Sequence, residues 1–193
     1  MKALAINGSP RKGGNTETLL RKAMEPIAEA GYGTEFLQLG GNPIRGCTAC
    51  GACGRMKNRQ CVMDDDLFNL VFMKMIDADA ILIGSPTYFA NMTAETAALI
   101  SRAGYVALAN GGLLRRKIGA AVVAKRRGGA VNVMDGINHL FLINQMIVPG
   151  STYWNMGLGS ARLDVLDDEE GLKNMRDLGE QIVWLFRMME QHV

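Results

Sequence analysis

The feature that most constrains this fold is an alternation of short apolar runs with segments of helical periodicity. The predicted strands are 2–6, 34–39, 78–84, 118–124 and 146–148. Between and after them, apolar residues recur every three or four positions, which predicts helices over 16–28, 67–75, 93–107 and 130–145 and from 167 or 168 onward. Strands that alternate with helices and are continuously apolar form parallel sheets covered on both faces. The sequence therefore predicts an α/β fold with a doubly wound five-stranded parallel sheet.

Length and charge set limits on the class of protein. At 193 residues and 48% hydrophobic content, we expect one domain over 1–193 that buries a sufficient core without disulfides. The start, MKALAINGSP, lacks the features of a secretory signal, and no run reaches about 18 apolar residues, so we expect a cytoplasmic protein with no membrane partner. The net charge of +2 does not favour a nucleic-acid partner.

The loop after the first strand, NGSPRKGGNTET at 7–18, has the composition of a phosphate site. Ligands of such sheets bind outside the carboxyl ends of the strands. Glycines let the backbone approach an anion, and the following helix start offers free N–H groups. A nucleoside-triphosphate loop would need Lys and then Ser or Thr where Gly14 and Asn15 stand, and the dinucleotide fingerprint is also missing. The loop predicts a site for one terminal phosphate, with Ser9, Arg11, Gly14, Asn15 and Thr16 as candidate ligands.

Two further loops should meet at the same edge of the sheet. The stretch GSPTYFANMTAE at 84–95 follows the third strand, and its aromatic rings and backbone amides suit a flat heterocycle. Its candidate binding residues are Pro86, Thr87, Tyr88, Phe89 and Asn91. After the fourth strand, the turn KRRGGA adds Arg126, Arg127, Gly128 and Gly129.

Together these loops resemble the NADPH-dependent FMN reductase branch of the flavodoxin-like fold. In that family a GSPRxxGNT-type loop holds the FMN phosphate, and an SPTYF-type loop lines the isoalloxazine ring. The order of elements agrees over nearly the whole chain. The resemblance implies a flavodoxin-like oxidoreductase that binds FMN non-covalently and forms a homodimer or homotetramer. Since FMN carries the chemistry, and neither His139 nor His192 has a visible partner, we expect no catalytic side chain.

All four cysteines lie in one loop. We expect this loop to be an insertion over about residues 40–63. They are Cys47, Cys50, Cys53 and Cys61. Disulfides, a metal or plain thiols would each explain the cluster, and a reducing cytoplasm disfavours disulfides. Within the family, this C-x2-C-x2-C-x(n)-C pattern looks like the iron-sulfur flavoproteins, in which these positions hold a 4Fe-4S cluster near FMN. Thiolates three residues apart can reach three corners of a cubane, whereas zinc usually takes two separate pairs. We rank the cluster first, clusterless thiols second and zinc third.

These observations lead to one preferred hypothesis and two alternatives. The preferred hypothesis is an FMN-dependent relay from a ferredoxin-like carrier, through the 4Fe-4S cluster and FMN, to a small-molecule acceptor. The basic side chains Arg45, Arg55, Lys57 and Arg59 would then guide an acidic carrier, or else form a solvated loop. The first alternative is a clusterless FMN/quinone-type oxidoreductase with NAD(P)H as donor. The second is a binding or sensor module whose cysteines hold zinc or respond to oxidation.

Overall fold

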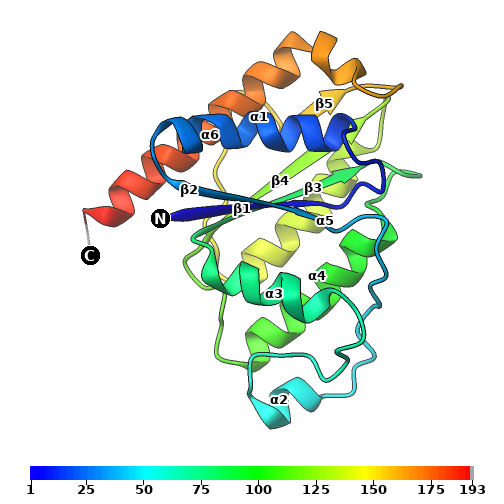
Figure 1. The fold of residues 1–193 in the computed structure, drawn as a ribbon, viewed down its shortest axis with the longest axis vertical. Coiled ribbons are helices and arrows are strands. Elements are labelled where there is room, and N and C mark those ends of the chain that lie inside the picture. Colours follow the sequence, from blue (N-terminus) through cyan, green and yellow to red (C-terminus); the bar gives the residue numbers. More distant parts are fainter. Residues whose placement is uncertain (192–193) are drawn as a thin grey trace.

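The computed structural model describes residues 1–191 and contains a five-stranded sheet with the order β2-β1-β3-β4-β5 (Figure 1). Its strands are β1 (Lys2–Asn7), β2 (Gly33–Gln38), β3 (Ala80–Pro86), β4 (Ile118–Lys125) and β5 (Met156–Leu158). Every neighbouring pair is parallel. The strand order reverses between β1 and β3, so a crevice is expected where the carboxyl ends of these two strands diverge into their loops. The predicted α/β fold is confirmed.

Helices cover both faces of the sheet. They are α1 (Asn15–Glu29), α2 (Ala52–Met56), α3 (Phe68–Asp77), α4 (Ala94–Ala109), α5 (Ala130–Ile143) and α6 (Glu169–Glu190), with a short 3-10 helix η1 at Asp164–Asp167. Side chains alternate along β1 because successive strand residues point to opposite faces. Leu4 and Ile6 enter the core under α3, α4 and α5, whereas Ala3 and Ala5 enter the core under α1 and α6 (Figure 1). The two cores therefore share one sheet.

The position predicted for the fifth strand, 146–148, is wrong. Ile147 makes a single parallel bridge with Ile118, and the strand proper lies later, at Met156–Leu158 beside the end of β4. Pairing stops after Ile147 because Pro149 has no N–H to donate to a ladder and Gly150 follows it. The chain then loops out and returns, and the N–H of Val123 donates to the carbonyl of Asn155 (2.9 Å).

The cysteine-bearing insertion leaves the layered body and runs along α4. Apart from the five-residue α2 it has no helix or strand, and α2 lies at the end of the molecule remote from the loop between β1 and α1 (Figure 1). Within residues 1–191, none of the helices combines the length and the apolar character that crossing a bilayer requires. His192 lies outside the described residues.

Candidate functional site

A cleft of about 210 Å³ opens where β1, β3, β4 and β5 end. The sequence predicted nine of its lining residues: Ser9, Arg11, Gly14, Asn15, Thr16, Pro86, Thr87, Tyr88 and Arg126. It missed the other six: Ala124, Lys125, Gly159, Ser160, Ala161 and Arg162. Four of the lining side chains are cationic and none is a carboxylate, which makes the cleft suited to an anion.

One end of the cleft is built from the start of α1. Gly14 is the N-cap of this helix, and no side chain accepts a hydrogen bond from the first-turn N–H groups there. Such groups, with the positive end of the helix dipole, form an anion site. The preceding loop is ordered by short-range contacts, since the Ser9 hydroxyl accepts from the N–H of Arg11 (3.2 Å) and Asn7 Oδ1 accepts from the N–H of Ser9 (3.1 Å). This end of the cleft therefore suits a phosphate.

The side chain of Asn15 has protein partners. Its Nδ2 donates to the carbonyl of Ala161 (2.8 Å), and its Oδ1 accepts from the N–H of Val165 (3.4 Å). These bonds fasten the segment after β5 to the first residue of α1. Asn15 lines the cleft as predicted, and its amide group organises the second loop that borders the anion site.

The other end of the cleft is bordered by the loop after β3. The Thr87 N–H donates to Ala124 O (2.9 Å), but its buried hydroxyl has no hydrogen-bond partner within residues 1–191. Tyr88 and Asn91 exchange two backbone hydrogen bonds (2.8 and 2.9 Å) around Phe89 and Ala90. Both central residues have positive φ (49° and 59°), as in a type I′ turn, which glycine and asparagine normally occupy. The loop is a tight hairpin tip, and Thr87 Oγ1 is buried beside the cleft without a hydrogen-bond partner in the described residues.

Five predicted binding residues do not line the cleft: Phe89, Asn91, Arg127, Gly128 and Gly129. Phe89 is fully exposed at the hairpin tip. Gly129 acts on the cleft indirectly, since it has φ +84° and a Cβ there would lie 2.8 Å from the Cα of Ala90. The turn after β4 thus packs against the loop after β3 on the side away from the cleft lining. Sequence reasoning missed the segment 159–162 because the fifth strand was placed too early, which hid a fourth loop at this edge of the sheet.

The four cysteines line a second, small cavity together with Tyr105 and Val106 of α4. All four are free thiols, with Cys53 buried and Cys47 and Cys50 exposed. Burial raises the pKa of Cys53, and the neighbouring Cys61 and Cys47 raise it further. The N–H of Ala52 lowers the pKa of Cys50. Thiols gathered in this way become thiolates most readily around a shared cation.

The two metal hypotheses place different demands on the cysteines of this cavity. A tetrahedral zinc ion with Zn–S bonds of about 2.3 Å holds its thiolates within roughly 3.8 Å of one another. Within residues 1–191, no three His, Cys, Asp or Glu side chains are grouped for a single ion. A 4Fe-4S cluster takes each thiolate on a different iron and so needs four cysteines more widely spaced around one cavity. The four cysteines share one cavity, as a cluster requires, and the Ala49 N–H donates to Cys47 Sγ (3.4 Å).

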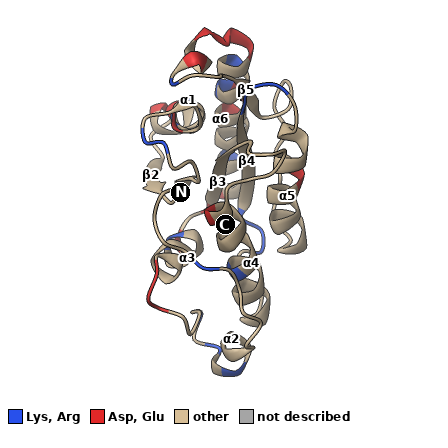
Figure 2. Ribbon diagram, turned by 90° about the vertical axis from the view of Figure 1, so that its right-hand side faces the viewer, with Lys and Arg blue, Asp and Glu red and all other residues tan. Residues whose placement is uncertain are grey.

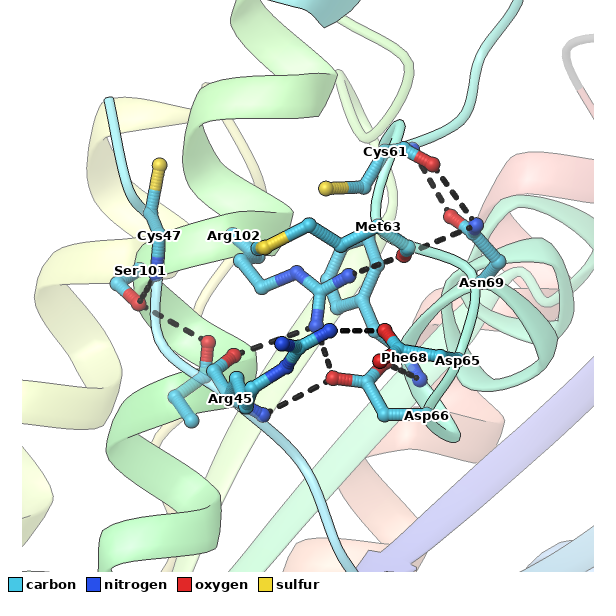
Figure 3. A network of polar contacts seen from close by, with 11 residues as sticks. Arg45, Cys47, Cys61, Met63, Asp65, Asp66, Phe68, Asn69, Ser101 and Arg102 are labelled. Atoms are coloured by element: carbon cyan, nitrogen blue, oxygen red, sulfur yellow. Dashed lines mark hydrogen bonds and ion pairs between the residues drawn. The ribbon is translucent and has the colours of Figure 1, made fainter. Parts of the chain in front are cut away.

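A buried arginine holds the two ends of the cysteine loop together (Figure 3). Arg102, on α4, is 1% exposed and pairs with Asp66 at 2.5 Å. Its guanidinium also donates to the carbonyls of Arg45 (3.2 Å) and Met63 (2.7 Å) and lies 4.1 Å from the ring centroid of Phe68. Burial would raise the pKa of Asp66, but the N–H groups of Arg45 and Phe68 and the Arg102 charge lower it overall.

Three further side chains fix individual points of the loop. Asn69 of α3 exchanges two hydrogen bonds with the backbone of Cys61, each 2.9 Å (Figure 3). Asn110, after α4, accepts from the N–H of Arg59 (3.0 Å) and donates to the carbonyl of Cys53 (3.4 Å). The Ser101 hydroxyl accepts from the N–H of Cys47 (3.3 Å). The helices α3 and α4 therefore preposition the cysteines.

The cleft and the cysteine cavity share no lining residue. Helix α4 connects them, since its N-cap Thr93 donates to the carbonyl of Gly8 (2.8 Å) near the cleft, and Tyr105 on the same helix lines the cavity. The α4 residues that line the cavity, Arg102, Tyr105 and Val106, lie nine to thirteen residues after Thr93, which is about 14–20 Å of helix. The cavity therefore lies that far along α4 from the contact between Thr93 and Gly8.

Comparisons with known proteins agree with this geometry. The family model described as NADPH-dependent FMN reductase matches residues 1–161. An iron-sulfur flavoprotein of Methanocaldococcus jannaschii is 35% identical over 198 residues, covering 99% of this chain and 100% of that relative. Among solved structures, RosB with a bound 8-demethyl-8-formylriboflavin-5'-phosphate intermediate has a TM-score of 0.77 at 19% identity, covering 99% of this chain and 81% of that one. A flavodoxin from the domain Archaea has a TM-score of 0.59 at 16% identity, covering 94% and 99%. At these identities the structures show a shared fold.

Proposed function

Because the chain belongs to the NADPH-dependent FMN reductase and iron-sulfur flavoprotein family, we propose that it relays electrons from a carrier protein through a 4Fe-4S cluster and FMN to a small acceptor. The family makes it a flavin-dependent oxidoreductase with FMN as cofactor. The relay is our own inference. The observation that carries it is the convergence of all four cysteines on one cavity, remote from the cleft.

The cleft provides what FMN needs at each end. The first turn of α1, with Ser9 and Arg11, would hold the phosphate, and Pro86, Thr87 and Tyr88 would border the ring. The unpaired Thr87 hydroxyl would bind a polar edge atom of the ring. FMN itself supplies the one- and two-electron chemistry when bound. The chain orients it, and no side chain of the cleft is needed as an acid, base or nucleophile.

In this proposal Cys47, Cys50, Cys53 and Cys61 hold the cluster. Support comes from their free thiols, their common cavity and the N–H groups aimed at two of the sulfurs. The clamps from Arg102, Asn69 and Asn110 fix the loop without using a cysteine side chain, so all four sulfurs stay available to iron. Cysteines that are not paired in disulfides persist in a reducing compartment, and we infer a cytoplasmic location.

The surface next to the cysteines suits an acidic electron carrier such as a ferredoxin-like protein. Arg55, Lys57 and Arg59 are exposed there (α2 end, Figure 2), and no acidic residue occurs in the sequence between Glu35 and Asp64. Met56 is 57% exposed and Val62 52%, so an apolar contact lies beside the cations. Complementary charge speeds encounter, and an apolar centre stabilises the docked pair.

The cavity lies about 14–20 Å along α4 from Thr93, and this offset determines how the relay can be completed. Electron transfer slows steeply with distance, and the cleft is lined by no residue of the cysteine loop. We infer that the cluster of one subunit serves the flavin of a neighbouring subunit in a homodimer or homotetramer. The same separation favours a second candidate, a clusterless NAD(P)H-dependent oxidoreductase, because the cleft is complete without the cysteines.

Anaerobic purification followed by iron, acid-labile sulfide and flavin analysis tests the proposal. We expect iron and sulfide in equal amounts together with FMN, and loss of the iron but not of the FMN in Cys53→Ser. A wild-type protein that contains flavin but neither retains nor accepts iron would leave only the clusterless oxidoreductase. A colourless protein that cannot be reconstituted with FMN would overturn both candidates.

A further inference from the structure

The segment after β5, residues 159–164, forms a strap beside the anion end of the cleft. Gly159, Ser160, Ala161 and Arg162 all line the cleft. Asn15 bonds this segment at Ala161 and at Val165, just after it. A Cβ on Gly159 would lie 2.4 Å from Asn15 Nδ2, so the strap approaches α1 as closely as only a glycine allows. It is held against the first turn of α1 at several points.

Arg162 projects from this strap towards the loop that precedes α1. Its Nε donates to the carbonyl of Gly13 (3.1 Å), and a Cβ on Gly13 would lie 2.8 Å from its Nη2. Within residues 1–191, no carboxylate lies within 4.0 Å of the Arg162 guanidinium. The nearby Asp164 accepts instead from the N–H groups of Ser160 (3.0 Å) and Ala161 (2.5 Å), which stiffens the strap. The carboxylate of Glu17, which accepts from the N–H of Gly13 (2.7 Å), interacts with the Arg162 charge over a longer distance, and the Nη groups of Arg162 remain as donors for a ligand.

We propose that Arg162 completes the phosphate site and selects flavins that end in a phosphate monoester, binding FMN in preference to riboflavin and to FAD. The inference rests on FMN occupying the cleft. A terminal phosphate carries close to two negative charges at neutral pH, whereas each phosphate of a dinucleotide carries one. The guanidinium groups of Arg11 and Arg162 both lie at the cleft, and together they bind a dianion more strongly than a monoanion.

Flavin-free protein titrated with FMN, riboflavin and FAD tests this selectivity. In Arg162→Ala we expect the dissociation constant for FMN to rise about tenfold to a hundredfold, with that for riboflavin unchanged. The preference for FMN over FAD should fall as well. Arg162→Lys should restore part of the FMN affinity, because lysine supplies the charge without the planar fork. Lys12→Ala is the matched control, since Lys12 lies in the adjacent loop but does not line the cleft.

The outcomes separate the two inferences. Failure of the unaltered protein to bind FMN would overturn the flavin assignment itself. Normal FMN binding with the same affinity in Arg162→Ala would overturn only the role of Arg162. An equal loss of FMN and riboflavin affinity would also overturn it, because it would mean that Arg162 merely supports the fold. Thermal unfolding of each variant is measured alongside the titrations.

Discussion

Gly129 positions the ring end of the cleft although it does not line it. Its φ is +84°, and a Cβ would lie 2.8 Å from Ala90 and 3.2 Å from the Thr87 side chain. We expect Gly129→Ala to lower the free energy of unfolding by about 1–3 kcal/mol and to weaken FMN binding, because the loop after β3 must shift. Chemical denaturation and flavin titration measure the two effects.

Gly128 provides the control for this substitution. A Cβ there would meet nothing within 4 Å, so Gly128→Ala should change the free energy of unfolding by no more than about 0.5 kcal/mol. Equal effects of the two substitutions would show that the support of Ala90 by Gly129 is unimportant.

Asp66 makes the stability of the cysteine loop dependent on pH. The N–H groups of Arg45 and Phe68 and the charge of Arg102 outweigh burial and lower its folded pKa below 3.8. Its carboxylate therefore stabilises the fold fully above that value and stops doing so as the pH falls through the folded pKa. We expect the unfolding free energy to drop below about pH 4, and to drop less steeply in Asp66→Asn. Equal slopes in the two proteins would contradict this assignment.

At the scale of elements, α3 and α4 determine the shape of the cysteine loop. Asn69 links α3 to the backbone of Cys61 through two hydrogen bonds of 2.9 Å. We expect Asn69→Ala to lower the free energy of unfolding by about 1–3 kcal/mol and to speed the loss of iron, with FMN content unchanged. The exposed Asn132 on α5 offers a matched control, Asn132→Ala. Iron release to a chelator is the measurement, and identical rates in both variants would refute the role of Asn69.

The elements also differ in how well the sequence predicted them. In α1, Leu19, Leu20, Ala23, Met24 and Ile27 are buried at the helical spacing that indicated them. The three-residue β5 was missed because Met156–Leu158 is too short to show a period, and it forms only because the end of β4 offers it backbone partners. Because β5 was missed, the sequence also failed to predict that residues 159–162 line the cleft. The local hydrophobic pattern therefore identified long elements such as α1, whereas the short strand β5 depends on pairing with a segment distant in the sequence.

At the scale of the whole molecule, the distance between cleft and cysteine cavity predicts cooperation between subunits. We expect Cys53→Ser protein, which keeps its flavin, to regain electron transfer from a carrier when mixed with a variant that keeps its cysteines but cannot bind FMN. Subunit exchange would then bring an intact cavity beside an intact cleft. The rate of flavin reduction by a reduced carrier is the measurement.

The controls for this experiment are the two variants assayed separately, and sedimentation of the mixture establishes that subunits associate. Mixed assemblies that form but stay as inactive as the separate variants would contradict transfer between subunits. The relay would then have to run within one chain, along the length of α4 between the cavity and the cleft.

The sequence alone determined the α/β fold and the family, because the periodicity, the loop after β1 and the cysteine spacing are local properties of the chain. It also identified most of the residues on the cleft wall. Only the tertiary structure decided that Arg162 joins the anion site, that Gly129 supports the hairpin tip and that the cysteines lie along α4, away from the cleft. These are contacts between segments far apart in the sequence. Their geometry depends on how the sheet and helices pack, which no local pattern specifies.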